Sequence, residues 1–309
     1  MSPRRLAIAA IWLAAAALPL AHPSPYLLHI AILTGIYVLL VQSLNLVLGY
    51  CGLLSLATPA FFGIGAYVAT LLSLRFGLDS SLTFAAAAGA GVVTAVALAV
   101  PSLRLSRHSF VIVTLSFTLL LQLIATNWTD LTRGALGLAD IPPPRLFGIA
   151  WTDRIVWYYG LLAAAALSLG LIHAIVGSRV GRALIATRDN EPLAVAVGLA
   201  TLRLKIFAFA VSGAYAGLAG AAYAHYLTYI DPGVFGFDLT ESLLIMVILG
   251  GPGTLWGPVV GAIVFTALPE ILRLTPELRS LLYGAILLAI VLFLPRGLLG
   301  GWRAARVDG

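Results

Sequence analysis

The apolar runs of this chain restrict its fold more than any other feature of the sequence. Most of them reach about 20 residues, the length that a helix needs to cross the hydrocarbon core of a bilayer. The 309-residue chain is 61% hydrophobic and only 10% charged, whereas soluble domains carry about 25% charged residues. The sequence shows no long strand-like alternation of apolar and polar residues. We therefore predict an all-α, polytopic membrane helical bundle rather than a β-barrel.

We expect a single transmembrane domain over residues 1–309 with about ten membrane-spanning helices. The expected spans are 6–21, 26–48, 53–74, 82–101, 109–127, 155–176, 203–226, 239–254, 258–273 and 279–295. The first of these runs could instead be a secretory signal peptide. A cut after Ala21 would place Pro19 at a position where a small residue is needed. A retained first span is therefore favoured, and cleavage stays open.

The basic residues fit an orientation with both ends of the chain in the cytoplasm. With a cytoplasmic N-terminus, the alternating spans leave 12 of the 18 basic residues on the cytoplasmic side, but only three of the 12 acidic residues. These basic residues are Arg4, Arg5, Arg104, Arg107, Arg179, Arg182, Arg188, Arg203, Lys205, Arg296, Arg303 and Arg306. Lysine and arginine accumulate in cytoplasmic loops, so we predict a multi-pass membrane protein with both termini in the cytoplasm. The same bias explains the formal charge of +6 without nucleic-acid binding.

Residues 49–65, GYCGLLSLATPAFFGIG, differ from a plain spanning helix. Proline removes a backbone donor and kinks a helix, and four glycines surround Pro59 within this stretch. Non-helical backbone at membrane depth persists only where protein or a water-filled cavity satisfies its polar groups. We expect a helix broken near Pro59. Two interpretations remain, a helix that lines the solute pathway and a close-packed kink.

Glycines elsewhere predict packing and turns. Gly213, Gly217 and Gly220 give the seventh span a flat face that allows close helix approach. The stretch 250–258, GGPGTLWGP, is Gly-rich but no Gly-Lys-Ser/Thr follows it, so it is not a phosphate-binding Walker A loop. A tight turn or a junction between half-helices is expected there.

The predicted spans hold few charges that could drive transport. Apart from His29 and His173, we find no ionisable residue at mid-depth in them, whereas ion-coupled carriers bury acidic or basic residues near the midplane. We also find no nucleotide-binding motif, no Ser/His pair and no metal-ligand spacing, and Cys51 is the one cysteine. We expect a non-enzymatic transport protein that binds no cofactor or metal itself and receives energy from a partner.

Polar but uncharged side chains form candidates for the translocation pathway. The candidates are Gln42, Asn45, Ser55, Thr58, Pro59, Phe61, Thr114, Thr118 and Gln122. Thr114, Thr118 and Gln122 follow i, i+4, i+8 spacing, which places them on one face of the fifth span. Such residues could give a passing solute brief hydrogen bonds. Hydrogen bonding between neighbouring helices is the alternative role.

Residues 177–204, which we call the docking segment, are the longest polar interruption that keeps a helical pattern. We expect a short helix over 181–189, a stop and restart at 189–192 because proline suits a first helical turn, and a second helical turn over 193–197. Gly198 then allows a C-cap. We predict that this cytoplasmic helix pair docks onto another protein, although a basic interfacial loop would be the simpler interpretation.

Four stretches resemble the permease subunits of ABC importers for branched-chain amino acids. They are SRVGRALIATRDNEPLAVAVGL, KIFAFAVSGAYAGLAGAAYAHY, GLLSLATPAFFGIGAYVATLL and GGPGTLWGPVVGA. With the span pattern, the resemblance covers about residues 28–297. It is closer to the second of the two unlike permease types, which has a long outer loop after the fifth span, than to its partner.

The resemblance implies a coupling helix over residues 182–198, seated in a groove of an ATPase subunit. Its contacts would be Arg182, Ala183, Arg188, Asp189, Glu191, Ala194 and Gly198. Implied partners are a second permease, two ATP-binding subunits that bind ATP and Mg²⁺, a periplasmic solute-binding protein and membrane lipid.

The resemblance leaves the solute open. The family's usual Gly-Gln-Leu-Ser-Leu-Gly-His is replaced at residues 52–58 by a sequence with Leu53 and Thr58 in place of the glutamine and histidine. A branched-chain amino acid is expected, and urea or a short amide is the alternative within the family. An ion-coupled carrier and a passive channel are further alternatives outside it.

Overall fold

The computed structural model describes residues 24–146 and 149–272, together with Trp12, residues 15–21, Gly284, Leu288, Gly297 and Leu298. Six helices in this part are long and apolar enough to cross a membrane. They are α2 (Pro25–Asn45) with its continuation η2 (Leu46–Tyr50), α3 (Thr58–Phe76), α4 (Ser80–Ser102), α5 (Arg107–Asn127), α7 (Arg154–Gly177) and α10 (Thr201–Leu227). The predicted all-α membrane bundle is confirmed.

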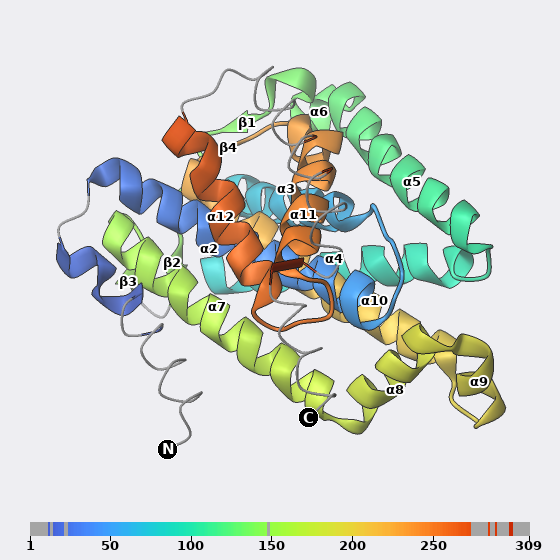
Figure 1. The fold of residues 1–309 in the computed structure, drawn as a ribbon. Coiled ribbons are helices and arrows are strands. Elements are labelled where there is room, and N and C mark those ends of the chain that lie inside the picture. The colour runs from blue at the N-terminus through green and yellow to red at the C-terminus, as the bar shows by residue number, and fades with distance from the viewer. Residues whose placement is uncertain are drawn as a thin grey trace.

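The remaining elements are short. The helical ones are η1 (Leu18–Ala21), α6 (Thr129–Thr132), η3 (Gly134–Leu136), α8 (Arg179–Asp189), α9 (Glu191–Ala196), η4 (Pro232–Phe235), α11 (Phe237–Gly250) and α12 (Gly257–Leu272). Strand β1 (Leu138–Ala139) pairs antiparallel with β4 (Tyr229–Ile230), and β2 (Arg145–Leu146) pairs with β3 (Ile149–Ala150). Figure 1 shows α8 and α9 at one end of the bundle and β1 and β4 at the opposite end.

Some of the expected spans differ from the observed helices in length or position. Helices α11 and α12 correspond to the expected spans 239–254 and 258–273. Helix α11 has 14 residues, fewer than a bilayer crossing needs, and the described part of α12 has 16 residues. Half of the first expected span, residues 6–11, 13 and 14, and nearly all of the tenth lie outside the described residues. The expected turn at 250–258 is present, since α11 ends at Gly250 and α12 begins at Gly257.

Glycines bring α3, α4 and α10 together, as the small-residue face of the seventh span predicts. A Cβ added to Gly217 would overlap the backbone of Ala87 on α4, and one added to Gly65 would overlap Gly217 itself. Gly91 and Gly213 make the same close approach between α4 and α10. These contacts require residues without side chains, so the backbones pack directly on each other.

The helix break near Pro59 takes a specific form. Residues 51–57 are not helical, and Pro59 lies in the first turn of α3, where a missing N–H costs little. The expectation that this span begins at residue 53 is therefore wrong, because the break precedes the proline. Both backbone groups of Leu56 are bonded to α5: its N–H donates to Thr114 Oγ1 at 3.2 Å, and its C=O accepts from Thr118 Oγ1 at 3.1 Å.

A second irregular segment enters the bundle from the β1–β4 end. After β4, η4 buries Phe235 against Gly63 of α3, and the Phe235 ring stacks on Tyr67 with centroids 5.8 Å apart. Helix α11 therefore begins inside the bundle, beside the first turns of α3.

Candidate functional site

The docking segment folds as two capped helices. The Ser178 hydroxyl accepts from Gly181 N–H at 3.3 Å at the start of α8. Asn190 Oδ1 accepts from Leu193 N–H at 3.0 Å at the start of α9. These side-chain caps satisfy backbone donors that a helix start leaves unpaired. The stop and restart around residue 190 is confirmed, and Gly198 follows α9 in the left-handed conformation with φ +86°.

One side of the docking segment packs on the rest of the chain. Leu184 is fully buried, and Ala194 is buried as well. Glu191 forms an ion pair with Lys205, which is itself buried at the start of α10. These contacts hold α8 and α9 in a fixed position.

The other side of the docking segment exposes apolar side chains. Leu193 is 60% exposed, Val195 55% and Val197 69%. The expectation that Ala194 contacts a partner is corrected here, because Ala194 is buried against its own chain while these three residues are accessible. Of the other expected contacts, Arg182, Asp189 and Gly198 are exposed, and Ala183 and Glu191 are half-buried.

Arg188 joins the docking segment to the interior of the bundle. Its Nη1 donates to the Gly49 carbonyl at 2.8 Å, and its Nε and Nη2 bind Asp189 Oδ1 at 2.9 and 2.8 Å. Any side chain at Gly52 or Gly253 would collide with Arg188. The arginine thus contacts the end of η2, the start of the helix break and the loop after α11.

Two of the predicted pathway residues hold that loop, residues 251–256. Gln42 Nε2 donates to the Leu255 carbonyl at 2.9 Å. Asn45 Nδ2 donates to the Thr254 carbonyl at 2.9 Å, and Asn45 Oδ1 accepts from Gly253 N–H at 2.9 Å. Loop 251–256 therefore lies on α2 through side chains that share one face of that helix.

The other predicted pathway residues surround the helix break. Ser55 Oγ accepts from Ala57 N–H at 3.3 Å, Thr114 and Thr118 bind Leu56, and Phe61 packs edge-to-face on Phe209 at 6.4 Å. Thr58 and Pro59 are buried in the first turn of α3, and Gln122 is half-buried on α5. These side chains make interhelical and local contacts, and none of the nine predicted residues lines the cavity described next.

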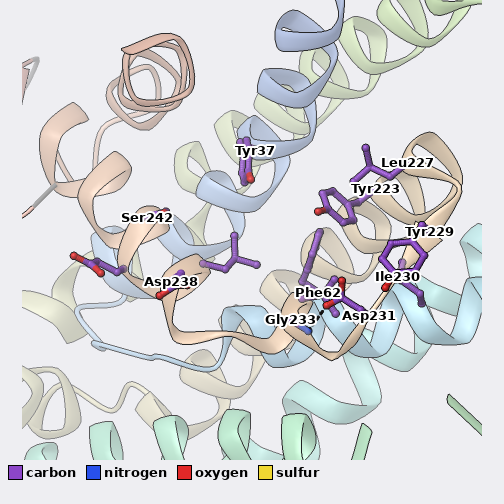
Figure 2. A pocket seen from close by; sticks show the side chains of 13 residues that line it. Tyr37, Phe62, Tyr223, Leu227, Tyr229, Ile230, Asp231, Gly233, Asp238 and Ser242 are labelled. Atoms are coloured by element: carbon purple, nitrogen blue, oxygen red, sulfur yellow. Dashed lines mark hydrogen bonds between the residues drawn. The ribbon is translucent and has the colours of Figure 1, made fainter. Parts of the chain in front are cut away.

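A cavity of about 540 Å³ opens between α2, α3, α10 and α11. Figure 2 shows Tyr37 and Tyr223 on one side of it and Asp231 and Asp238 on the other. We call it the acidic pocket. Its lining residues are Tyr37, Phe62, Tyr223, Leu227, Tyr229, Ile230, Asp231, Gly233, Val234, Asp238, Leu239, Glu241 and Ser242.

Sequence reasoning missed the acidic pocket. Asp231 and Asp238 were expected in the connection outside the spans, and Glu241 at a span end. The available signal was the pair Asp231-Pro232 followed by Gly233, a turn that Asp231 caps by accepting from Gly233 N–H. Hydropathy cannot show that this turn enters the bundle. Among the described residues, no group of three His, Cys, Asp or Glu could bind a metal ion.

Six helices of spanning length, a cavity between them and a helix pair outside them define this chain as an integral membrane permease. The family described as "Branched-chain amino acid transport system / permease component" matches residues 26–291. This chain belongs to that family, as its resemblance predicted, and it is a transport subunit rather than an enzyme.

Individual relatives agree with the family match. The chain is 32% identical over 293 residues to the high-affinity branched-chain amino acid transport system permease protein LivM of Escherichia coli (strain K12), covering 87% of this chain and 69% of the relative. LivH of the same strain is 24% identical over 289 residues, covering 85% and 91%. The autoinducer 2 import system permease protein LsrC of Yersinia enterocolitica is 29% identical over 235 residues, covering 73% and 63%. No solved structure matches this chain.

Proposed function

We propose that this chain forms half of the translocation pathway of an ABC importer for branched-chain amino acids in the bacterial inner membrane. A second, LivH-like permease would form the other half, two ATPases would bind ATP and Mg²⁺, and a periplasmic protein would deliver the solute. The similarity to LivM and, at lower identity, to LivH supports a pair of unlike permeases. In this proposal both termini and the docking segment are cytoplasmic.

The observation that carries the proposal is the two-sided docking segment. One side is fixed to the bundle by Leu184 and by the Glu191–Lys205 ion pair. The other side presents Leu193, Val195 and Val197. Exposed apolar residues at a rigid helical projection suit a partner groove.

A displacement of the docking segment would reach the bundle through Arg188. Its guanidinium binds the Gly49 carbonyl, and Gly253 of loop 251–256 lies against it. Since α2 and this loop are also joined by Gln42 and Asn45, a shift of α8 would move α2 and α11 together. Nucleotide binding in the ATPases would then bias two arrangements of the pathway.

Uptake measurements separate this proposal from its alternatives. A passive channel or an ion-coupled carrier needs no ATPase, so ATP-dependent uptake into proteoliposomes distinguishes the importer from both. A panel of leucine, urea and short amides distinguishes the branched-chain solute from the alternatives within the family.

We predict that the variant Leu193→Asp/Val197→Asp inserts normally but loses its ATPase subunits. Burying each apolar side chain in a partner groove contributes about 1.5–3 kcal/mol, so co-purified ATPase should fall by more than about tenfold. Leu136→Asp is the matched control, because Leu136 is 82% exposed and ends η3, directly before β1, which lies at the opposite end of the molecule (Figure 1). Normal ATPase yield in the double variant would reject the docking role.

A further inference from the structure

We propose that the acidic pocket binds a primary ammonium group carried on an apolar skeleton. In this proposal the permease recognises the solute by its amino group. The inference takes the solute class from the function proposed above. The pocket's own ligand chemistry follows from its lining.

The charge of the lining points to a cation. Asp231, Asp238 and Glu241 contribute carboxylates, and no Lys, Arg or His is among the residues of the described chain that line the cavity. None of the three carboxylates has an ion-pair partner within the described part of the chain. Carboxylates gathered without a cation repel one another and favour a bound positive charge.

The depth of the pocket strengthens that preference. Tyr37 lies at the middle of the span formed by residues 25–50, and Phe62 lies in the second turn of α3. The rings of Phe62 and Tyr223 pack at 5.3 Å with an interplanar angle of 62°. Asp231 and Glu241 are half-buried, whereas Asp238 is exposed. The local dielectric inside a bundle is lower than in water, so the two half-buried carboxylates act more strongly on a bound charge.

Aromatic rings form a further part of the lining. Tyr37, Tyr223 and Tyr229 offer ring faces, which attract ammonium ions. The buried Tyr67 hydroxyl nearby has no hydrogen-bond partner in the described part of the chain, but Tyr67 is not among the residues that line the cavity.

The remaining lining fits an aliphatic chain. Leu227, Ile230, Val234 and Leu239 are apolar, and a cavity of about 540 Å³ lies within the usual range for small-molecule pockets. An ammonium group would bind at the carboxylates, and a branched alkyl group would pack on these apolar side chains. One ligand would thus fit both the acidic and the apolar part of the lining. Urea and neutral amides lack the charge, and organic anions that carry no ammonium group would be repelled.

The test uses three probes with one carbon skeleton: 3-methylbutylamine, 3-methylbutanamide and 3-methylbutanoate. Binding of each to the purified full-length chain in nanodiscs, co-expressed with its permease partner, is measured by competition with labelled leucine and by calorimetry. We expect the amine to bind at least about tenfold more tightly than the amide, and the carboxylate not to bind. Equal binding of the three probes, or no binding of the amine, would overturn the inference.

Substitutions at the carboxylates test whether amine binding occurs in the acidic pocket. Asp238→Asn/Glu241→Gln should weaken amine binding by about tenfold or more, whereas the charge-conserving Asp238→Glu/Glu241→Asp should retain most of it. Asp130→Asn is the control, since Asp130 is an exposed carboxylate that does not line the pocket. Unchanged amine affinity in the neutralised variant would also overturn the inference.

ATP-driven leucine uptake by the wild-type complex is recorded in parallel. Amine binding without ATP-driven uptake would reject the importer and leave the pocket chemistry standing. ATP-driven uptake without selective amine binding would reject the pocket chemistry and leave the importer standing.

Discussion

Arg188 is the residue through which the docking segment reaches the membrane part of the chain. It donates to a backbone carbonyl that the end of η2 leaves available, and it packs where Gly52 and Gly253 provide space. Arginine suits this position because its planar guanidinium binds two partners at once, here Gly49 and Asp189. A side chain that only docked onto a partner would not need these inward contacts.

We expect Arg188→Ala to separate ATP hydrolysis from transport. A hydrogen bond from a charged donor contributes about 1.5–3 kcal/mol, so leucine uptake should fall by about tenfold while ATPase subunits still co-purify. Arg203→Ala is the control, because Arg203 is an exposed arginine at the start of α10. Parallel measurement of ATPase rate and uptake checks this, and tight coupling in Arg188→Ala would argue against the proposed route.

In the helix break between η2 and α3, the backbone groups of Leu56 find their hydrogen-bond partners on α5. Thr114 and Thr118 are the eighth and twelfth residues of the 21-residue helix, about 10 and about 16 Å from its start. Leu56 therefore lies well inside the span, where free backbone groups are costly. The two threonines serve the break structurally, and they explain why an extended segment survives there.

Replacing both hydroxyls by methyl groups should destabilise this region. In Thr114→Val/Thr118→Val, the buried N–H and C=O of Leu56 lose partners at about 1–3 kcal/mol each, which predicts a melting temperature lower by about 5 °C or more. Thr126→Val on the same helix is the control, since its hydroxyl bonds only the Gln122 carbonyl of that helix. Equal melting temperatures for all three proteins would contradict the assigned role of Thr114 and Thr118.

Local sequence patterns predicted the helices well, but they did not predict a pocket formed by segments that are far apart in the sequence. The capped restart at Asn190 and the glycine face of α10 were predictable because helix caps and small-residue spacing act within a few residues. The acidic pocket was not, because it forms only where η4 meets Gly63 of α3, about 170 residues earlier in the chain. The contact of Arg188 with Gly49 has the same cause.

The whole molecule has two functional ends in this account. The acidic pocket opens between the helices toward the β1–β4 end, and the docking segment projects from the other. Six helices of spanning length hold the ends apart, with α2, Arg188 and loop 251–256 between them. The charge distribution of the sequence predicts that the docking end is cytoplasmic.

The native cysteine, Cys51, should react too slowly to interfere with labelling of an introduced cysteine. Cys51 is buried, and burial raises the pKa of its thiol to about 12, an increase that the nearby Lys205 charge only partly offsets. The thiolate is the reactive form, so labelling of Cys51 should be slow at pH 7 and still rising with pH at pH 9. A cysteine introduced at an exposed position would react far faster, with the usual pKa of about 8.5.

The most direct measurement is cross-linking of Val197→Cys in the assembled complex. A thiol-reactive cross-linker added to inside-out vesicles should join this residue to an ATPase subunit, and an impermeant maleimide should leave it unlabelled in intact cells. Leu136→Cys, at the opposite end, should show the converse labelling. Labelling of Val197→Cys from outside, or an assembled complex in which it cross-links to no ATPase, would contradict the account.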